Sequence, residues 1–590
     1  MMITRPEYPR PQLVRADWLN LNGDWLFEYD DDDAGLRDQW FTRHEFSQSI
    51  TVPFAYQARL SGIGETAFHD IVWYERQFEL PDAWQGQHVL LHFGAVDYQA
   101  TVWVNGQFVA AHEGGHVPFT ADVTHALQPG HNRVTVRAED HSTDLEQPRG
   151  KQYWETQSAS IFYTRTTGIW QTVWLEPVPE THLERYTLLP DIDSGQIALE
   201  FFVAQPQDGL TMRIAVTRGG ALVTELRIAI DTARTGASLQ MGKPEELALW
   251  SPENPALYDL ALELWQGDTC LDALTSYFGM RKIATDGGKV LLNNQPYMMR
   301  LVLDQGYTPD GILTFPSDEA IRRDVELTKA LGFNGARKHQ KVEEPRYLYW
   351  ADQLGLLVWG EMANAYQYSA SAVRRITHEW LEAIERDFNH PCIVAWVPVN
   401  ESWGVPDLAG DSRQTEHLLA LYHLVRSLDP SRLVISNDGW EHARTDLLTI
   451  HDYEGSGDVL RARYATRDSI LQARPAKRDL YVSGFAWRGE PILVTEFGGI
   501  AYQKDAQEGW GYTAASSDDD FLRRYEAVVA AILASPQVHG FCYTQLTDVE
   551  QEINGLLTYD RQPKVDLARI RAITAADVHH RGTGDRHATG

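Results

Sequence analysis

The first 180 residues carry short runs in which hydrophobic and polar positions alternate, separated by Gly, Pro, Asn and Asp. This pattern is typical of antiparallel β-strands with one buried face. The clearest pair is Gln99–Val104 and residues 107–111, which flank Asn105-Gly106, a dipeptide that supplies the two positive φ angles of a tight hairpin turn. Residues 1–180 are therefore predicted to form a jelly-roll β-sandwich, which ends near Pro177-Val178-Pro179.

Strand patterns continue through residues 181–282. The runs that carry them are Gln196–Val203 and residues 210–217, 238–241 and 258–265. About a hundred residues of antiparallel pattern fit an immunoglobulin-like β-sandwich, and we predict one here.

Beyond residue 282, apolar strands alternate with amphipathic helical stretches such as residues 318–331 and 372–388. This alternation is typical of βαβ units around a parallel sheet. The strand candidates are residues 297–303, 334–337, 356–359, 393–399, 433–436, 448–451, 492–495 and 540–544. Eight repeats predict a (β/α)8 TIM barrel over residues 283–576, whereas a doubly wound sheet would more often show about five or six strands and a glycine-rich phosphate motif. Residues 577–590 are polar and predict a disordered tail.

Charge and cysteine content narrow the classes of partner. The chain of 590 residues has 52 Lys and Arg against 82 Asp and Glu, a formal net charge of −30. This charge opposes nucleic acid and anionic membrane surfaces, so neither is expected as a partner. Cys270, Cys392 and Cys542 form neither a disulfide framework nor a zinc spacing, and no metal or cofactor is predicted. Without a signal-peptide pattern or a long apolar run, the protein is expected to be cytoplasmic, and a homo-oligomer is compatible with these features.

Active sites of such barrels lie at the carboxyl ends of the strands, so the polar residues that follow each predicted strand are the candidates. These residues are Asp304, Arg337, His339, Glu361, Asn400, Glu401, Asn437, Asp438, His451, Asp452, Tyr453, Glu496, Gln545 and Asp548. Three of them are glutamates after apolar strands, where a carboxylate has no packing role and is costly to bury unless it is paired.

Two carboxylates that flank a bond are the minimum apparatus for glycoside hydrolysis. Glu401 and Glu496 follow strands four and seven, which lie on opposite sides of the barrel mouth, so the two can face each other across a sugar. Glu361 follows the strand next to that of Glu401 and is expected to support the pair rather than to belong to it. Asn400 and Trp403 flank Glu401, where the amide can bind a sugar hydroxyl and the indole can form a platform for a sugar ring.

Several motifs resemble glycoside hydrolase family 2, the family of β-galactosidases, β-glucuronidases and β-mannosidases. They are Leu21-Asn22-Gly23-Asp24-Trp25, Gly168-Ile169-Trp170-Gln171-Thr172-Val173-Trp174, Phe278-Gly279-Met280-Arg281, Val399-Asn400-Glu401 and Thr495-Glu496-Phe497-Gly498. The likeness covers nearly the whole chain, and the family's order of sandwich, immunoglobulin-like domain and barrel matches the order predicted from the pattern.

The resemblance implies a retaining mechanism, with Glu496 as nucleophile and Glu401 as acid and then base. Glu496 is expected to stay ionised beside Arg337 and Tyr453, whereas Glu401 is expected to have a raised pKa and to hold its proton. Asn400 would bind the 2-hydroxyl of the sugar, where hydrogen bonds strengthen in the transition state. His339 resembles the family's histidine after strand two, and His451 is a candidate sugar ligand or a satisfied core histidine.

The substrate is expected to be a terminal neutral sugar. Residues 540–564 resemble β-glucuronidases, but the loop that reads the uronate carboxylate in that subfamily carries Asp548, Glu552 and Asn554 here. Like charge would disfavour a uronate, so glucuronides are expected to react more slowly and β-galactoside is the first choice. β-Glucuronidase, β-mannosidase and arabinofuranosidase activities stay open, as does a catalytically inactive carbohydrate-binding protein.

Overall fold

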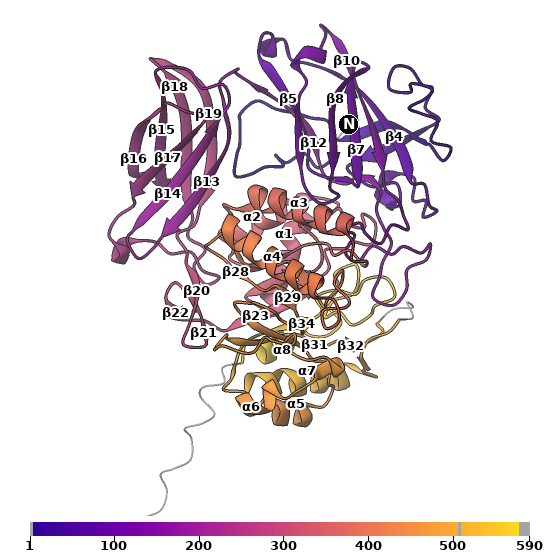
Figure 1. The fold of residues 1–590 in the computed structure, drawn as a ribbon, viewed down its shortest axis with the longest axis vertical. Coiled ribbons are helices and arrows are strands. Elements are labelled where there is room, and N and C mark those ends of the chain that lie inside the picture. The colour runs from indigo at the N-terminus through magenta and orange to yellow at the C-terminus, as the bar shows by residue number, and fades with distance from the viewer. Residues whose placement is uncertain (1–3, 505–508, 577–590) are drawn as a thin grey trace, which may run out of the picture.

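The computed structural model describes residues 4–504 and 509–576 and consists of two β-sandwiches beside a barrel (Figure 1). The sandwiches lie side by side at the top of Figure 1, and the barrel lies below them. The tail predicted at residues 577–590 lies outside the described residues.

The first sandwich packs a four-stranded sheet against a six-stranded sheet. The four-stranded sheet consists of β1 (Leu19–Asn20), β12 (Val173–Val178), β5 (His88–Phe93) and β9 (Phe119–Asp122), in spatial order. The six-stranded sheet consists of β3 (Gln48–Val52), β2 (Gly23–Tyr29), β4 (Ile71–Glu79), β10 (His131–Glu139), β7 (Gln99–Val104) and β8 (Gln107–Glu113). A short pair, β6 (Val96–Asp97) and β11 (Gly168–Ile169), adjoins them. The predicted hairpin is confirmed, because Asn105 and Gly106 join β7 to β8 with φ angles of 50° and 79°.

The second sandwich has its own core, in which alternate residues such as Leu260, Leu262 and Leu264 are buried. One sheet consists of β13 (Leu183–Asp191), β14 (Gln196–Val203) and β17 (Arg234–Gln240). The other consists of β16 (Ala221–Ile230), β15 (Leu210–Arg218), β18 (Tyr258–Gln266) and β19 (Thr269–Phe278). A three-stranded meander of β20 (Ile283–Asp286), β21 (Lys289–Leu292) and β22 (Gln295–Pro296) leads from this sandwich into the barrel.

Eight parallel strands form the predicted barrel, which is confirmed. They are β28 (Leu433–Val434), β26 (Ile393–Val397), β25 (Leu357–Glu361), β24 (Gly335–Lys338), β23 (Met299–Asp304), β34 (Val538–Thr544), β31 (Ile492–Gly498) and β30 (Leu448–His451), in spatial order. Two short parallel pairs extend it, namely β27 (Val399–Asn400) with β29 (Asn437–Asp438) and β32 (Ile500–Ala501) with β33 (Thr513–Ala514). Nearly every residue of strands such as β26 and β31 is buried, as expected where helices cover both faces of a parallel sheet, and most are apolar.

The helices lie outside the strands. They are α1 (Asp318–Ala330), α2 (Pro345–Leu354), α3 (Ala370–Asp387), α4 (Ser412–Leu428), α5 (Gly457–Arg463), α6 (Arg467–Leu471), α7 (Asp518–Leu533) and α8 (Leu567–Thr574). Helices α1, α3 and α7 begin after Ser317, Ser369 and Ser517, whose hydroxyls each accept a hydrogen bond from the backbone N–H three residues on. In the described stretch between β28 and β30 there is no helix, and β29 instead extends the mouth of the barrel there.

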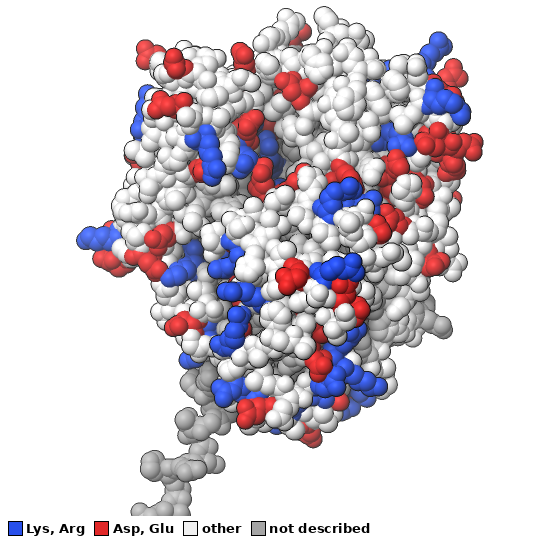
Figure 2. All heavy atoms as spheres, in the orientation of Figure 1, with Lys and Arg blue, Asp and Glu red and all other residues white. Residues whose placement is uncertain are grey.

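On the face shown in Figure 2, basic side chains are interspersed with acidic ones and form no continuous basic band. Among the described helices, none has both the length and the apolar character that crossing a bilayer requires.

Candidate active site

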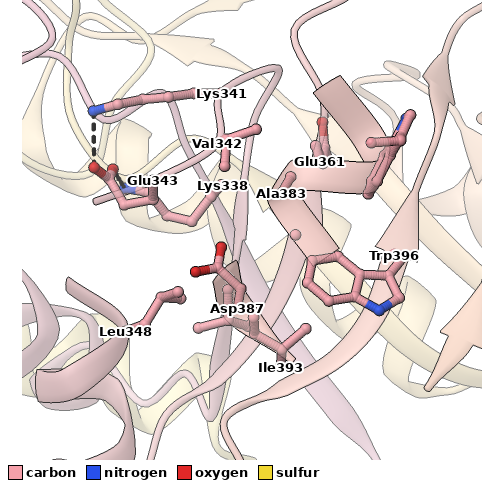
Figure 3. A pocket seen from close by; sticks show the side chains of 13 residues that line it. Lys338, Lys341, Val342, Glu343, Leu348, Glu361, Ala383, Asp387, Ile393 and Trp396 are labelled. Atoms are coloured by element: carbon pink, nitrogen blue, oxygen red, sulfur yellow. Dashed lines mark ion pairs between the residues drawn. The ribbon is translucent and has the colours of Figure 1, made fainter. Parts of the chain in front are cut away.

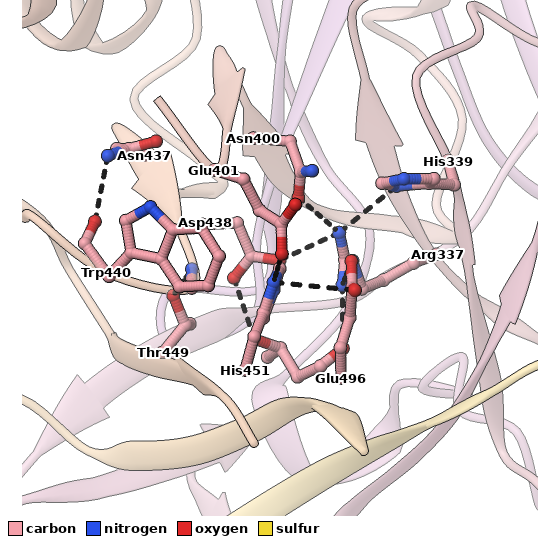
Figure 4. Close-up of polar contacts among 12 residues, drawn as sticks. Arg337, His339, Asn400, Glu401, Asn437, Asp438, Trp440, Thr449, His451 and Glu496 are labelled. Atoms are coloured by element: carbon pink, nitrogen blue, oxygen red, sulfur yellow. Dashed lines mark hydrogen bonds and ion pairs between the residues drawn. The ribbon is translucent and has the colours of Figure 1, made fainter. Parts of the chain in front are cut away.

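Glu401 and Glu496 meet at the carboxyl ends of the barrel strands, as predicted. Glu496 lies within β31, and Glu401 follows β27 in a turn where its φ is 53° and that of Ser402 is 60°. The N–H of Glu401 donates to the carbonyl of Asp438 at 2.9 Å, which holds this left-handed turn in place. One carboxylate oxygen of Glu401 lies within 4.8 Å of one of Glu496, and Nδ1 of His451 lies between them (Figure 4). This separation is close to the roughly 5–5.5 Å that retaining glycosidases use.

Arg337 pairs with three carboxylates, those of Glu496, Glu361 and Asp438. Its guanidinium lies 2.7 Å from Glu361, 2.8 Å from Asp438 and 3.3 Å from Glu496, and it is fully buried. It also donates to the carbonyl of Thr495 at 2.6 Å and to Oδ1 of Asn400 at 3.2 Å. Burial by itself lowers the pKa of Arg337, but the three carboxylates raise it by more than burial lowers it, so Arg337 remains a cation.

His451 lies between the acid residues. Its Nδ1 is 2.8 Å from Glu401 and 3.5 Å from Glu496, and its Nε2 is 3.0 Å from Asp438. Burial opposes the charged imidazolium, but these carboxylates raise the pKa of His451 to about 10. His451 is therefore a buried histidine whose two ring nitrogens are both satisfied by carboxylates, and direct contact with a sugar stays a prediction.

The expected pKa of Glu401 is also wrong in direction. Burial favours the neutral acid, but the hydrogen bond and the charge of His451 lower the pKa of Glu401 below its ordinary value. The apolar strand before Glu401 suggested a raised pKa because the histidine that determines it lies 50 residues later in the chain.

Glu496 has the neighbours predicted for a nucleophile. The hydroxyl of Tyr453 donates to it at 2.6 Å, and Arg337 donates to the other oxygen at 3.3 Å. Burial and the charge of Glu496 raise the pKa of Tyr453 well above its ordinary value, so this hydroxyl keeps its proton. Tyr512 stacks on Tyr453 with ring centroids 3.4 Å apart and fixes the ring.

Glu361 supports the site from behind, as expected. One oxygen accepts from Arg337 at 2.7 Å, and the other lies 2.9 Å from Nδ1 of His339 and accepts from the N–H of Gln340 at 3.0 Å. Burial favours the neutral acid, but Arg337 and His339 lower the pKa of Glu361. His339 is thus positioned by Glu361 rather than by either facing glutamate.

Asn400 and Trp403 lie beside Glu401 but differ in their partners. Oδ1 of Asn400 accepts from Arg337, whereas Nδ2 makes no hydrogen bond within the described chain and is available to a ligand. Trp403 packs edge-on against Tyr366 and Phe162, with ring centroids 5.0 Å and 6.1 Å away. Phe162 comes from the first sandwich, so the aromatic wall of the mouth is built by two parts of the chain.

Asp304, Gln545 and Asp548 have other partners. Asp304 is buried, and its oxygens accept from Lys338 at 2.6 Å and from the N–H of Gly306 at 2.8 Å. Lys338 also pairs with Glu343 at 2.9 Å, beside Lys341 (Figure 3). The carboxylate of Asp304 is thus paired within the chain, and its contact with a sugar stays a prediction.

The amide of Gln545 is fully buried and hydrogen-bonded at both ends, to Gln305 and Asn554. Asp548 pairs with Lys564 at 2.6 Å. Both side chains are therefore engaged within the chain, and their roles in sugar binding stay predictions.

Sequence reasoning missed the role of one candidate residue and the presence of a second residue near the site. Asp438 was among the strand-end residues, but its role in pairing with both Arg337 and His451 depends on three-dimensional register. Lys151 belongs to the loop of residues 149–163 of the first sandwich, which docks on the barrel where the N–H groups of Arg149 and Gly150 donate to the carbonyl of Asn364. The charge of Lys151 contributes to the lowered pKa of Glu401. No pattern in the sequence indicates that this loop reaches the barrel mouth.

Three residues of this site carry atoms that could bind a metal ion. Glu401, His451 and Glu496 each offer one such atom within 4.8 Å of the others. Because Glu401 pairs with His451, and Glu496 pairs with Arg337 and Tyr453, the arrangement is already explained by pairing among the described residues.

Replacing His451 by glutamine is expected to move the alkaline limb of the activity–pH profile upward by about 1–2 pH units. The imidazolium lowers the pKa of Glu401, so its removal lets the acid keep its proton to higher pH. The measurement is kcat/KM against pH for an alkyl glycoside, whose leaving group needs the proton. A dinitrophenyl glycoside is the control, because its alkaline limb should move little. An unchanged alkyl limb would show that His451 does not control Glu401.

Models of a single family match most of residues 19–457. The sugar-binding domain of glycosyl hydrolases family 2 matches residues 19–179, a further family 2 domain matches residues 181–281, and the family 2 TIM barrel domain matches residues 283–457.

The similar proteins are named either β-glucuronidase or β-galactosidase. A β-glucuronidase of Paenibacillus borealis is 24% identical over 96% of this chain and 98% of its own length. A β-galactosidase of Thermoanaerobacter pseudethanolicus is 27% identical over 68% of this chain, which spans only 54% of that relative. The β-glucuronidase of Felis catus is 26% identical over 83% of this chain and 79% of its own length.

Solved structures agree on the fold. The β-glucuronidase of Bifidobacterium dentium, complexed with coumarin-3-O-glucuronide, superimposes with a TM-score of 0.78 at 22% identity, over 96% of this chain and 98% of that one. The β-glucuronidase of Ruminococcus gnavus gives a TM-score of 0.77 at 20% identity over 97% and 100% of the two chains. On the three family matches, which together span most of residues 19–457, this chain belongs to glycosyl hydrolases family 2.

Proposed function

We propose that the protein is a retaining, exo-acting β-glycosidase in which Glu496 is the nucleophile and Glu401 is the acid and then the base. The observation that carries the proposal is the distance below 4.8 Å between oxygens of the two glutamates, which leaves room for a glycosidic bond but not for an additional water as in inverting enzymes. The surrounding charges fit the two roles, since Glu496 lies beside a permanent cation and a hydroxyl donor.

In the first step, a carboxylate oxygen of Glu496 forms a bond to the anomeric carbon while the bond to the leaving oxygen breaks. Glu401 gives that oxygen its proton. A bound sugar excludes water from Glu401 and so favours the protonated acid. In the second step, Glu401 takes a proton from water, the water oxygen attacks the anomeric carbon, and the Glu496 carboxylate leaves with net retention. Asn400 offers its Nδ2 to the 2-hydroxyl through both steps.

A terminal β-glucuronide is the substrate that we favour. The relatives that match most of the chain over most of their own length are named β-glucuronidases. The physical objection from the acidic loop is also weaker than the sequence suggested, because Asp548 is neutralised by Lys564 and Glu552 accepts hydrogen bonds from Tyr163 at 2.5 Å and Asn554 at 2.9 Å. A terminal β-galactoside is the second candidate, since two relatives are named β-galactosidases. Arg561, a further cation of the acidic loop, pairs with Asp324 at 3.0 Å and is not free to bind a uronate carboxylate.

Lys151 is the cation that we assign to a uronate carboxylate. The residue is 7% exposed, yet its ammonium forms no hydrogen bond or ion pair with the described part of the chain. Its Nζ lies 6.0 Å from the ring centroid of Phe162, and its charge acts on Glu401. A buried cation with spare donors at the mouth is suited to an anionic sugar.

The decisive measurement is kcat/KM for the p-nitrophenyl β-D-glucuronide, galactoside, mannoside and arabinofuranoside. The glucuronide is expected to be the best of the four, and Lys151→Met is expected to lower its kcat/KM by about 10–100-fold, because a hydrogen bond to a charged group contributes about 1.5–3 kcal/mol. The galactoside serves as the internal control and should change little. A neutral glycoside that outperforms the glucuronide would favour the second candidate, and no turnover of any glycoside would favour a carbohydrate-binding protein.

A further inference from the structure

Two histidines and a glutamate converge where the first sandwich meets the barrel. His112 lies on β8, and His378 and Glu382 lie on α3. Nε2 of His112 is 3.1 Å from Oε2 of Glu382, and Nε2 of His378 is 3.4 Å from its Oε1. One nitrogen or oxygen of each residue lies within 4.8 Å of those of the other two. This group, here called the seam triad, shares no contact with Glu401 or Glu496 in the described structure.

The backbone holds the three side chains in place. His378 and Glu382 are one helical turn apart, so they project from the same face of α3. The ring of His112 stacks on Phe119 with centroids 4.7 Å apart. A Cβ on Gly114 would lie 3.2 Å from both His112 and Glu379 of α3, and the φ of Gly114 is +150°. Glycine at this position therefore permits the close approach of β8 to α3.

The triad is accessible from one side only. The side chain of His112 is 7% exposed, that of Glu382 27% and that of His378 52%. Nδ1 of His112 is buried without a hydrogen-bond partner among the described residues. The other ring nitrogen, Nε2, faces Glu382. Solvent can reach the triad past His378, which is half-exposed.

Two imidazole nitrogens and one carboxylate oxygen are the donor set preferred by Zn²⁺ and similar transition-metal ions. The two histidine nitrogens lie 3.1 Å from Oε2 and 3.4 Å from Oε1 of Glu382, and one ligand atom of each residue lies within 4.8 Å of the others, which is close enough to share one ion after small side-chain rotations. The net charge of −30 also favours capture of a cation. We propose that the seam triad binds one divalent transition-metal ion of the Zn²⁺ type, with a water as fourth ligand, and that this ion ties the first sandwich to the barrel.

Existing contacts show what such an ion would reinforce. Arg375 of α3 pairs with Glu113 of β8 at 2.8 Å and with Asp144 at 2.7 Å across the same junction. Partly exposed ion pairs of this kind contribute little stability by themselves. A metal ion bound only when β8 and α3 are docked would stabilise the docked arrangement by mass action.

The test uses the full chain, stripped with a chelator and titrated with Zn²⁺ by calorimetry and with Co²⁺ by visible absorption. The wild type is expected to bind one ion, and its thermal midpoint is expected to rise with Zn²⁺. His378→Gln and Glu382→Gln are expected to bind at least tenfold more weakly, and their midpoints should not respond. His131→Gln, which changes an exposed histidine of β10, is the matched control and should bind as the wild type does.

Two outcomes would overturn the proposal. One is binding by His378→Gln that equals binding by the wild type. The other is binding that persists in His378→Gln but is lost in Glu401→Gln, which would place the ion among Glu401, His451 and Glu496 instead. Because His378 is half-exposed, its replacement is not expected to affect folding, and a circular dichroism spectrum checks this.

Discussion

Replacing Glu496 by glutamine is expected to lower kcat/KM for every glycoside by at least about 10⁴-fold, because the group that attacks the anomeric carbon is lost. Glutamine has the same size and can still accept the hydrogen bond that Tyr453 donates at 2.6 Å. The fold is therefore retained, and the loss reports chemistry rather than unfolding. The measurement is turnover of the best p-nitrophenyl glycoside, with the urea midpoint of the variant compared with that of the wild type.

Glu401→Ala is expected to behave differently. Alkyl glycosides should lose about 10²–10⁴-fold, whereas dinitrophenyl glycosides, which leave without a proton, should form the glycosyl-enzyme at nearly the normal rate. Azide should then accelerate turnover, because it attacks the intermediate without needing a base, and the product should be the β-azide. An α-azide, or no rescue with any substrate, would contradict the assignment of Glu401 as the acid and base.

Glu361→Gln distinguishes the two pairings of carboxylates. Glu361 contacts Arg337 and His339 but neither Glu401 nor Glu496. The decrease in kcat/KM for Glu361→Gln should therefore be smaller than that for Glu401→Ala. If Glu361→Gln proved the more damaging change and was rescued by azide, the catalytic pair would have to be reassigned.

The barrel was predictable because each of its strands is a short apolar run that local sequence reveals. β30 lies at the predicted bounds, and α1 and α3 differ from the predicted ones by no more than two residues. The same local signal locates Glu401 and Glu496, since both directly follow such runs and the carboxyl ends of parallel strands meet at one face.

The partners of the strand-end residues were not predictable, because they depend on register between strands. Asp304 and Lys338 are direct neighbours across β23 and β24, so the lysine binds the carboxylate that seemed free for a ligand. Lys564, 16 positions later in the chain, likewise pairs with Asp548. The sequence indicates at which end of the barrel a side chain lies, but it does not indicate which charged residue pairs with that side chain.

Contributions from outside the barrel were also hidden. Phe162 and Lys151 belong to the first sandwich, and only the docking of its loop on the barrel brings them near Trp403 and Glu401. Pattern reasoning treats each predicted domain by itself, so residues that one domain lends to another carry no signal.

Arg337→Met is expected to destabilise the barrel by about 3–5 kcal/mol, the usual effect of removing one partner from a buried ion network. Three buried carboxylates depend on this side chain, at 2.7, 2.8 and 3.3 Å, and its guanidinium is wholly inaccessible to solvent. After its loss, Glu361 keeps His339, Asp438 keeps His451 and Glu496 keeps Tyr453, but the negative charge of the group is no longer balanced. Activity should fall with stability, because the charge of Glu496 would then lack its nearest permanent cation.

Urea unfolding followed by tryptophan fluorescence measures this loss, and Arg337→Lys separates charge from geometry. Lysine restores one positive charge but cannot reach three carboxylates at once, so it should recover only part of the stability. Arg413→Met is the matched control, since Arg413 pairs with Asp411 on the surface with its side chain 77% exposed, and its midpoint should not move. A wild-type midpoint for Arg337→Met would mean that the carboxylates share protons among themselves, and the site would then need no cation to hold Glu496 and Glu361 so close to Asp438.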